Sequence, residues 1–252
     1  MNSLLLLTHE VRDDSCAILE GARARYAFET HGVREGQSMK VAVLGGLRGE
    51  GRVLSASLEM VTLVLELTCT QVEPIPVTLI VGVSRPQTVK KVIQAAVMFG
   101  VSSLHFVRSE QGEKSYLQSR SLDEDQIQEE TIKALEQVWD SRPPQIVVHR
   151  TFSYFMDNKL PDIVSSAQDG PFHGKVLKLI AHPGGAPLGC ADASRVATAH
   201  SIIAVGPERG WSHEEVETFQ RAGFGVVGLG ERVVRVELAL VFLLGKLALL
   251  RA

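Results

Sequence analysis

Three spaced charges lie just ahead of the most apolar segment of this chain. Arg232, Arg235 and Glu237 occur in "LGERVVRVELAL", which continues into an almost uninterrupted apolar run over residues 238–250. Charged side chains are seldom placed beside such a buried segment without partners. The pattern therefore indicates either an Arg–Glu pair that closes the start of a helix or a site for a charged substrate.

A second segment, "GPERGWSHEEV", defines its own geometry. Ser212 and Glu215 form a capping-box pattern and Trp211 with Val216 matches a hydrophobic staple, which predicts a helix over about 213–222. The preceding loop is then fixed at both ends, and its proline limits its flexibility. Rigid backbone N–H and C=O groups of this kind suit the edge of a flat heterocycle such as adenine. A rigid turn that binds nothing explains the same pattern.

A third glycine-bearing loop, "AHPGGAP", follows an apolar run, and all three loops come after expected strands. From residue 77 onward such runs alternate with helical patterns, which predicts a mostly parallel sheet covered by helices. Ligands bind where loops leave the carboxyl ends of parallel strands, so three such loops favour a binding site. The expected strands are 77–83, 103–107, 146–149, 176–181, 201–206 and 225–229, with a helix over about 123–140.

The helix after the first of these strands has recognisable ends. Ser84 with Gln87 forms a capping-box pattern, Pro86 suits the first turn, and Gly100 suits the C-terminal stop. The apolar positions between these ends follow helical spacing. These positions are Val89, Val92, Ile93, Ala96 and Val97.

The first 70 residues have a different texture. Short strand-like runs separated by glycine-containing turns predict a small β-barrel or sandwich without a long amphipathic helix. The four leucines near the start lack a basic segment before them, which favours a first buried strand over a signal peptide. "VEPIP" at 72–76 indicates a linker, because two prolines in three residues block continuation of a strand or helix.

Composition sets broad limits on the class of protein. The 252 residues are 45% hydrophobic with a net charge of −3, which predicts a soluble globular protein and argues against a uniformly basic nucleic-acid binder. Residues 23–52 and 85–120 each contain six Arg or Lys and could present local basic faces, or could carry only solvated surface charge. Three cysteines, Cys16, Cys69 and Cys190, fit no metal-ligand spacing, so we expect no disulfide, no zinc and a reduced cytosolic setting.

The C-terminal segment "VVRVELALVFLLGKLALL" is interrupted by Arg235, Glu237 and Lys246, which predicts a buried helix rather than a membrane span. An ordinary surface helix has one apolar stripe, whereas this one is apolar nearly all round. A subunit interface is therefore the expected second partner for this helix.

Taken together, "VGPERGWSHEEVE" and "GFGVVGLGERVVRVELAL" resemble the RsmE family of ribosomal RNA uracil-N3 methyltransferases. The family pattern is approximately GPEGG-(F/L)-S-x-x-E, followed by LG-x-R-(I/V)-LR-T-E-T-A. The resemblance extends upstream through "ALEQVWDSRPPQI" and "VGVSRPQTVKKVIQAAVMFGV", covering about 77–251, and more weakly through the first 70 residues.

The resemblance implies a two-domain fold and a set of partners. Residues 73–252 would form a SPOUT-type α/β methyltransferase domain with a trefoil knot, preceded by a PUA-like β-barrel RNA-binding domain at 1–72. It further implies S-adenosyl-L-methionine as methyl donor, small-subunit ribosomal RNA as substrate and a homodimer joined through the C-terminal domain. Neither a metal nor a membrane is implied, and the setting is cytoplasmic, or organellar in a eukaryote.

The resemblance also implies roles for individual residues. Glu237 is a candidate base or partner of the sulfonium, and Arg235 a candidate for stabilising the uracil oxyanion or a phosphate. The candidates for RNA contact are Arg85, Gln137 and Arg142, together with His31 and Arg34, which are displaced from the family register. The cofactor-binding residues would be His182, Pro183, Gly206, Pro207, Glu208, Gly210, Leu229, Gly230, Arg232, Val233 and Val234.

Several departures from the family pattern leave alternatives open. Arg209 replaces a small residue of GPEGG, Met98 stands where the family usually has Glu, and Val236 and Leu238 replace two threonines. Losing two hydroxyls removes hydrogen-bonding capacity, which favours a catalytically weak RNA-binding or ribosome-assembly protein as a second hypothesis. Arg235 and Glu237, which match the family pattern, argue against this second hypothesis. A Rossmann-type nucleotide-binding enzyme is disfavoured because no G-x-G-x-x-G follows an early strand.

Overall fold

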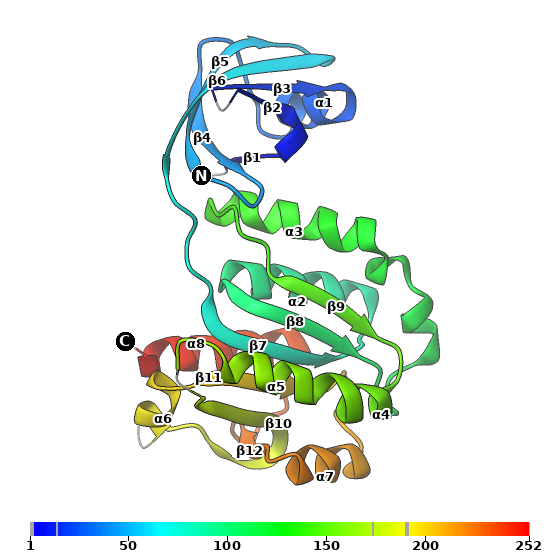
Figure 1. Ribbon diagram of the computed structural model, residues 1–252. Helices are drawn as coiled ribbons and strands as arrows, with labels where there is room; N and C mark the ends of the chain where they lie inside the picture. The colour runs from blue at the N-terminus through cyan, green and yellow to red at the C-terminus, as the bar shows by residue number, and fades with distance from the viewer. Residues whose placement is uncertain (1–2, 14, 173, 190–191, 252) are drawn as a thin grey trace. The chain divides into compact units, whose positions relative to one another are not determined.

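The computed structural model describes residues 3–13, 15–172, 174–189 and 192–251, and the chain divides into two compact units (Figure 1). The first unit comprises Met1–Glu73 and Glu129–Pro143, and the second comprises Pro74–Gln128 and Pro144–Ala252. The sequence pattern indicated a boundary near residue 72 but gave no sign that a later segment returns to the first unit.

The first unit is built on a six-stranded sheet in the order β1-β4-β5-β6-β3-β2. All neighbouring strands are antiparallel except β1 and β4. Helix α1 has only two buried residues, Ala24 and Ala27, so it carries little of the apolar periodicity by which a helix is recognised. Its elements are β1 Leu4–Leu6, η1 Thr8–Glu10, β2 Val11–Arg12, β3 Cys16–Glu20, α1 Gly21–Glu29, β4 Ser38–Val43, β5 Arg48–Ala56 and β6 Met60–Cys69.

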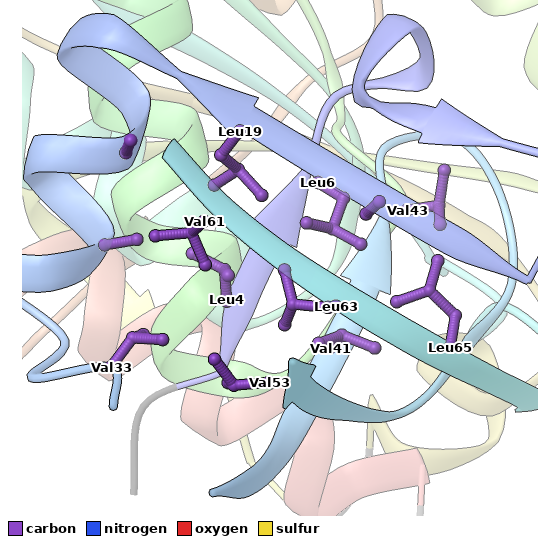
Figure 2. Packing of buried hydrophobic residues seen from close by; sticks show 13 residues of the cluster. Leu4, Leu6, Leu19, Val33, Val41, Val43, Val53, Val61, Leu63 and Leu65 are labelled. Atoms are coloured by element: carbon purple, nitrogen blue, oxygen red, sulfur yellow. The ribbon is translucent and has the colours of Figure 1, made fainter. Parts of the chain in front are cut away.

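The core of this unit follows from strand alternation. On β6, Val61, Leu63 and Leu65 point inward whereas Met60 and Val64 are exposed, as the two-residue period of a strand requires. The inward residues meet the first strand, whose leucines are fully buried, as the sequence predicted (Figure 2). The buried cluster comprises Leu4, Leu6, Ala17, Leu19, Ala24, Ala27, Val33, Val41, Val43, Val53, Val61, Leu63 and Leu65.

The second unit is an α/β domain whose six strands are all parallel, in the order β12-β10-β11-β7-β8-β9. Every strand expected from the sequence is present. The strands are β7 Ile75–Gly82, β8 Val101–Val107, β9 Gln145–His149, β10 Val176–Pro187, β11 His200–Val205 and β12 Gly225–Gly228. The helices are α2 Pro86–Met98, η2 Lys114–Gln118, η3 Arg120–Leu122, α4 Phe152–Tyr154, η4 Phe155–Lys159, α5 Leu160–Gln168, α6 Ala193–Ala197, α7 His213–Arg221 and α8 Val236–Arg251. Helix α3, Glu124–Val138, begins in the second unit and belongs to the first unit from Glu129 onward.

Helices cover both faces of this sheet (Figure 1). On one face Ile80 and Ile202 pack against Phe155 and against Phe219 of α7. Because side chains alternate along a strand, the neighbouring Leu79 and Ile203 point to the other face, where α2 and α8 contact the sheet and each other. Apart from Thr78 on β7 and from His200 and Ser201 at the start of β11, the central strands are accordingly apolar, as a doubly covered parallel sheet requires.

The order of the strands defines a switch point. The chain runs from β7 outward through β8 to β9, and then returns to the other side of β7 to add β10, β11 and β12. Connections therefore leave the adjacent carboxyl ends of β7 and β11 in opposite directions. Ligands of open parallel sheets bind in the crevice at such a point.

Three local predictions need correction. Pro76 does not end the linker but lies inside β7, where the pairing with β8 shifts register between Ile75 and Thr78 and so avoids the missing N–H. Strand β10 runs on to Pro187, and the expected loop is a break in its pairing with β12 between Ala181 and Ala186.

The third correction concerns the start of α2. Its N-cap is Arg85 rather than Ser84, whose Oγ instead donates to the Gly82 carbonyl at 2.9 Å. Pro86 occupies the first turn and Gly100, at φ +66°, follows the helix end, both as predicted.

Three further features of the described residues concern membrane-spanning helices, metal-ligand groups and the cysteines. No helix in this part of the chain is long and apolar enough to cross a membrane. The same residues contain no group of three His, Cys, Asp or Glu side chains placed to hold a metal ion. Cys16 and Cys69 are free thiols, and Cys190 lies outside the described residues.

Candidate active site

A cavity of about 1150 Å³ lies at the carboxyl ends of β7, β10, β11 and β12, at the switch point of the second unit. It is large enough for a nucleoside-sized ligand. All eleven residues predicted to bind a cofactor line it, as do the predicted catalytic pair Arg235 and Glu237, and Arg85. The remaining lining residues are Pro86, Gln87, Thr88, Lys91, Tyr116, Ala181, Val205, Arg209, Trp211, Glu231, Val236 and Ala239.

One wall of the cavity is the loop between β11 and α7. A Cβ on Gly206 would lie 2.8 Å from the carbonyl carbon of Gly210 and from the backbone nitrogen of Trp211, so only glycine allows this close approach. Gly210 has φ +76° and donates its N–H to the Pro207 carbonyl at 2.7 Å. The wall therefore presents backbone groups to the cavity in a tight turn.

The far end of this loop is anchored as the sequence predicted. Ser212 and Glu215 exchange backbone and side-chain hydrogen bonds of 3.2 and 2.8 Å, which completes the capping box. The carboxylate of Glu215, 2% exposed, also accepts from Ser109 Oγ at 2.8 Å and from the Glu110 N–H at 2.9 Å. Trp211 is buried against Phe219, with ring centroids 5.1 Å apart. The loop thus has little freedom to move.

Glu208 lines the cavity and also caps a helix. Its Oε1 accepts hydrogen bonds from the Arg85 backbone N–H and from Thr88 Oγ1, both at 3.0 Å. The carboxylate thereby caps the N-terminus of α2, where the helix dipole favours negative charge. The side chain of Glu208 joins the two walls of the cavity.

The loop after β12 forms another wall. Gly230 adopts φ +105°, which favours glycine, and the following Val233 and Val234 are 87% and 40% exposed. Both valines line the cavity, so they offer an apolar surface to a ligand. Arg232 and Arg235 flank them and are exposed.

Glu237, in the first turn of α8, forms an ion pair with Lys91 of α2, with 3.0 Å between Nζ and Oε1. Burial tends to raise the pKa of Glu237, but a hydrogen bond from its own backbone N–H, the Lys91 ammonium and the Arg235 charge outweigh burial and lower it. The carboxylate is therefore ionised at neutral pH. An ionised carboxylate with a lowered pKa is a weak proton acceptor but a suitable partner for a cation.

Sequence reasoning missed Lys91, Thr88 and Tyr116. Thr88 and Lys91 lie one helical turn apart on the polar side of α2, which in sequence resembles an ordinary solvated face. Tyr116 belongs to η2, a short 3-10 segment without periodicity, and its hydroxyl accepts a hydrogen bond from Arg85 Nε at 3.3 Å. Only their place around the cavity identifies these residues.

The other four predicted RNA contacts belong to the first unit. The His31 side chain is 3% exposed and its Nε2 lies 3.2 Å from the buried carboxylate of Glu136, so the structure removes it from the surface. Arg142 is tied to Glu73 at 2.8 Å. Arg34, whose guanidinium stacks 4.1 Å from the ring centroid of Phe28, and Gln137 are exposed.

Comparison with known proteins decides the family. The sequence profile of the RNA methyltransferase domain matches residues 71–248, most of the chain. The chain belongs to this family of RNA methyltransferases. A relative of this RNA methyltransferase, the ribosomal RNA small subunit methyltransferase E of Treponema pallidum (strain Nichols), is 27% identical over 244 residues, or 95% of this chain and 87% of the relative.

Solved structures show the same fold over nearly the whole RNA methyltransferase. A ribosomal RNA small subunit methyltransferase E from Neisseria gonorrhoeae, bound to S-adenosyl methionine, has a TM-score of 0.76 at 22% identity, covering 99% of this chain and 98% of that one. A Legionella pneumophila protein with bound cofactor SAM has a TM-score of 0.77 at 18% identity, covering 99% and 97%. The resemblance to the RsmE family and the predicted α/β fold class are confirmed.

Proposed function

We propose that this RNA methyltransferase transfers a methyl group from S-adenosyl-L-methionine to N3 of a uridine in small-subunit ribosomal RNA. One observation supports this most strongly: a single cavity is lined by all the residues that the motifs assign to the cofactor and by the Arg235–Glu237 pair. The names of the Treponema and Neisseria relatives support the same RNA and the same cofactor.

The cavity suits this cofactor in shape and charge. The close turn at Gly206 and the bare backbone of Gly210 and Gly230 leave room for a flat ring beside hydrogen-bonding groups. Val233 and Val234 supply an apolar surface. The ionised carboxylate of Glu237 supplies a counter-charge for a sulfonium. When bound, S-adenosyl-L-methionine supplies an electrophilic methyl group on a cationic sulfur.

The residues of the chain would act mainly by positioning and electrostatics. Glu237, held ionised by Lys91, is better suited to balance a cation than to remove a proton. Arg235 is exposed at the cavity and carries the positive charge that would stabilise a uracil from which the N3 proton has departed, or an adjacent phosphate. Glu208 would act indirectly by keeping the backbone wall in place against α2.

Val236 and Leu238, which replace the two threonines of the family pattern, differ in their position relative to the cavity. Val236 lines the cavity and is buried, so the hydroxyl of the family pattern is missing there. Leu238 is 55% exposed and does not line the cavity. One lost hydroxyl at the cavity favours retained activity over the second candidate, a catalytically weak RNA-binding or ribosome-assembly protein.

We also propose the domain roles implied by the family: residues 1–72 as a PUA-like RNA-binding domain and 73–252 as a SPOUT methyltransferase domain whose C-terminal segment passes through a trefoil knot. Arg34 and Gln137 are exposed candidates for RNA contact in the first unit, with Arg142 secondary because of its ion pair. His31 is withdrawn because its side chain is buried. The proposed setting is the cytoplasm, or an organelle that contains ribosomes.

We further propose that the protein is a homodimer joined through α8. One side of this helix packs on its own sheet, through Leu240, Leu244 and their neighbours. On the other side Leu238, Phe242 and Leu249 are 55%, 51% and 76% exposed, spaced so that they share a face. A contiguous exposed apolar face of this kind marks an interaction site, and the same face of a second copy is its proposed partner.

Ligand-induced stabilisation tests the cofactor part of the proposal. S-adenosyl-L-homocysteine at 100 times its Kd should stabilise the fold by about 2.7 kcal/mol and raise the melting temperature. Cytidine at the same concentration is the control, because it has neither the adenine ring nor the sulfur-bearing chain of S-adenosyl-L-homocysteine. No shift with S-adenosyl-L-homocysteine at millimolar concentration would contradict cofactor binding.

A further inference from the structure

The cavity has two unlike walls. The loops after β11 and β12 present glycine backbone and exposed valines, as described above. Another part of the lining, formed by the start of α2 and by η2, presents long polar side chains, namely Arg85, Lys91 and Tyr116. Since a methyl transferase must hold a donor and an acceptor at once, two chemically distinct walls suit two ligands. The side-chain wall is the one left for the RNA.

Tyr116 is the aromatic residue available at this wall. Among the described residues that line the cavity only Tyr116 and Trp211 have large aromatic rings. Trp211 is 4% exposed and its ring packs on Phe152 and Phe219, at 6.0 and 5.1 Å between centroids. Tyr116 is partly exposed, and no described aromatic or cationic group stacks on its ring. Among the described residues, no aromatic or cationic group therefore competes with a planar ligand for its ring.

Hydrogen bonds tether Tyr116 at its edge and connect it to the cofactor wall. Its hydroxyl accepts from Arg85 Nε at 3.3 Å, and the Arg85 backbone N–H donates to Glu208 Oε1 at 3.0 Å. Glu208 follows Pro207 in the glycine-rich loop. The chain Tyr116–Arg85–Glu208 thus fixes the position of the aromatic ring relative to the backbone wall through the hydroxyl at the edge of the ring.

A partly exposed ring at the cavity matches a requirement of the proposed reaction. N3 of uracil lies on the edge used for base pairing, so the target base must be unpaired and moved out of its stack before a methyl group can reach it. Proteins stabilise such bases by stacking them on aromatic side chains. The side-chain wall contains one ring suited to this and, beside it, an exposed Arg suited to the adjoining phosphate.

We propose that Tyr116 is a substrate-positioning residue on which the unpaired target base of the RNA stacks, and that Arg85 orients it and contacts the RNA backbone. This inference rests on the proposed function, because it assumes a nucleobase as acceptor. It assigns the nucleotide subsite to η2 and the start of α2, where the family resemblance implies an RNA contact for Arg85 but no role for Tyr116.

The test compares the full-length protein with Y116A, Y116F and the matched control Y154A. Tyr154 is 54% exposed and does not line the cavity. Binding is measured by fluorescence anisotropy, at saturating S-adenosyl-L-homocysteine, with a labelled single-stranded RNA containing one uridine and with the same RNA carrying an abasic site there. Melting temperatures verify folding, and the affinity for S-adenosyl-L-homocysteine is measured for each variant.

Stacking of one base contributes a factor of roughly 5 to 150 in affinity. The wild type and Y154A should therefore prefer the uridine RNA over the abasic RNA by about this factor, Y116A should lose the preference, and Y116F should retain most of it. Affinity for S-adenosyl-L-homocysteine should stay within about twofold. The inference is overturned if Y116A keeps the preference, if it loses cofactor affinity to the same extent, or if the wild type has no preference for the base.

The outcome for the proposed function is read separately. Methyl transfer to small subunits that lack the modification is measured with the same four proteins. A wild type that prefers the uridine RNA but transfers no methyl group contradicts the proposed function while the loss of preference in Y116A still supports the base subsite. If the wild type transfers methyl groups and Y116A has the same kcat/KM for RNA, the result supports the proposed function and overturns the base subsite.

Discussion

Substitution of Gly206 by Ala tests whether the backbone wall of the cavity holds the cofactor. An added Cβ would lie 2.8 Å from the Gly210 carbonyl carbon and the Trp211 nitrogen, whereas carbon atoms normally approach to about 3.5 Å or more. Neither neighbour can move freely, because Gly210 is hydrogen-bonded to Pro207 at 2.7 Å and Trp211 is buried among aromatic rings. Relief of the overlap must therefore deform the loop.

Overpacking of this kind costs about 1–3 kcal/mol. Where this cost falls on ligand binding rather than on folding, the Kd for S-adenosyl-L-homocysteine should rise roughly 5- to 150-fold, since about 1.4 kcal/mol corresponds to a factor of ten. Isothermal titration calorimetry measures the change, and the melting temperature without ligand measures how much of the cost falls on folding. Gly189→Ala is the matched control, because a Cβ there meets nothing within 4 Å. Unchanged affinity in G206A would refute the assignment of this loop to the cofactor.

Three further predictions concern other parts of the molecule. Replacing Lys91 by Met removes an ion pair that lowers the pKa of Glu237, so the acid limb of the activity profile should move to higher pH, whereas activity at pH 7, where Glu237 stays ionised, should change little. Lys175→Met, at an exposed site outside the cavity, should leave the acid limb where it is. Phe242→Glu places a charge on the exposed apolar face of α8 and should yield monomers in light scattering. Leu54→Glu, at a comparably exposed site on β5, should leave the protein dimeric. A monomeric wild type would rule out the dimer. Burial lowers the pKa of His105, which lies beside His149, to about 4, so the folded state favours the neutral imidazole. The free energy of unfolding, measured in urea, should therefore be highest above pH 6.5 and fall by up to roughly 3 kcal/mol as the pH drops toward 4. H105Q should flatten this pH dependence, and an equally steep dependence in H105Q would contradict the prediction.

Local sequence signals predicted the parts of the site whose geometry is local. The helix after Ser212 begins where its capping box and staple indicate, because every partner lies within four residues. The three loops meet at one cavity because parallel strands bring their carboxyl ends to one edge. Pattern and topology together were enough to find the backbone wall.

Features that depend on distant partners were mispredicted or missed. Ser84 and Gln87 match a capping box, yet α2 begins one residue later because Glu208, far along the chain, supplies the capping carboxylate. His31 is a candidate RNA contact by resemblance, yet its side chain is buried and pairs with Glu136, which lies in a segment that returns to the first unit. Tyr116 and Lys91 gain meaning only from the cavity they line. No local pattern encodes contacts of this range.

Mass spectrometry of methylated nucleosides tests the central claim most directly. Small ribosomal subunits lacking the modification would be incubated with the protein and S-adenosyl-L-methionine carrying a deuterated methyl group, and the RNA digested to nucleosides. We expect one labelled N3-methyluridine per small-subunit RNA with the wild type and none with E237Q or R235A. Label absent from the RNA despite measurable cofactor binding, or present on another atom or base, would contradict the central claim.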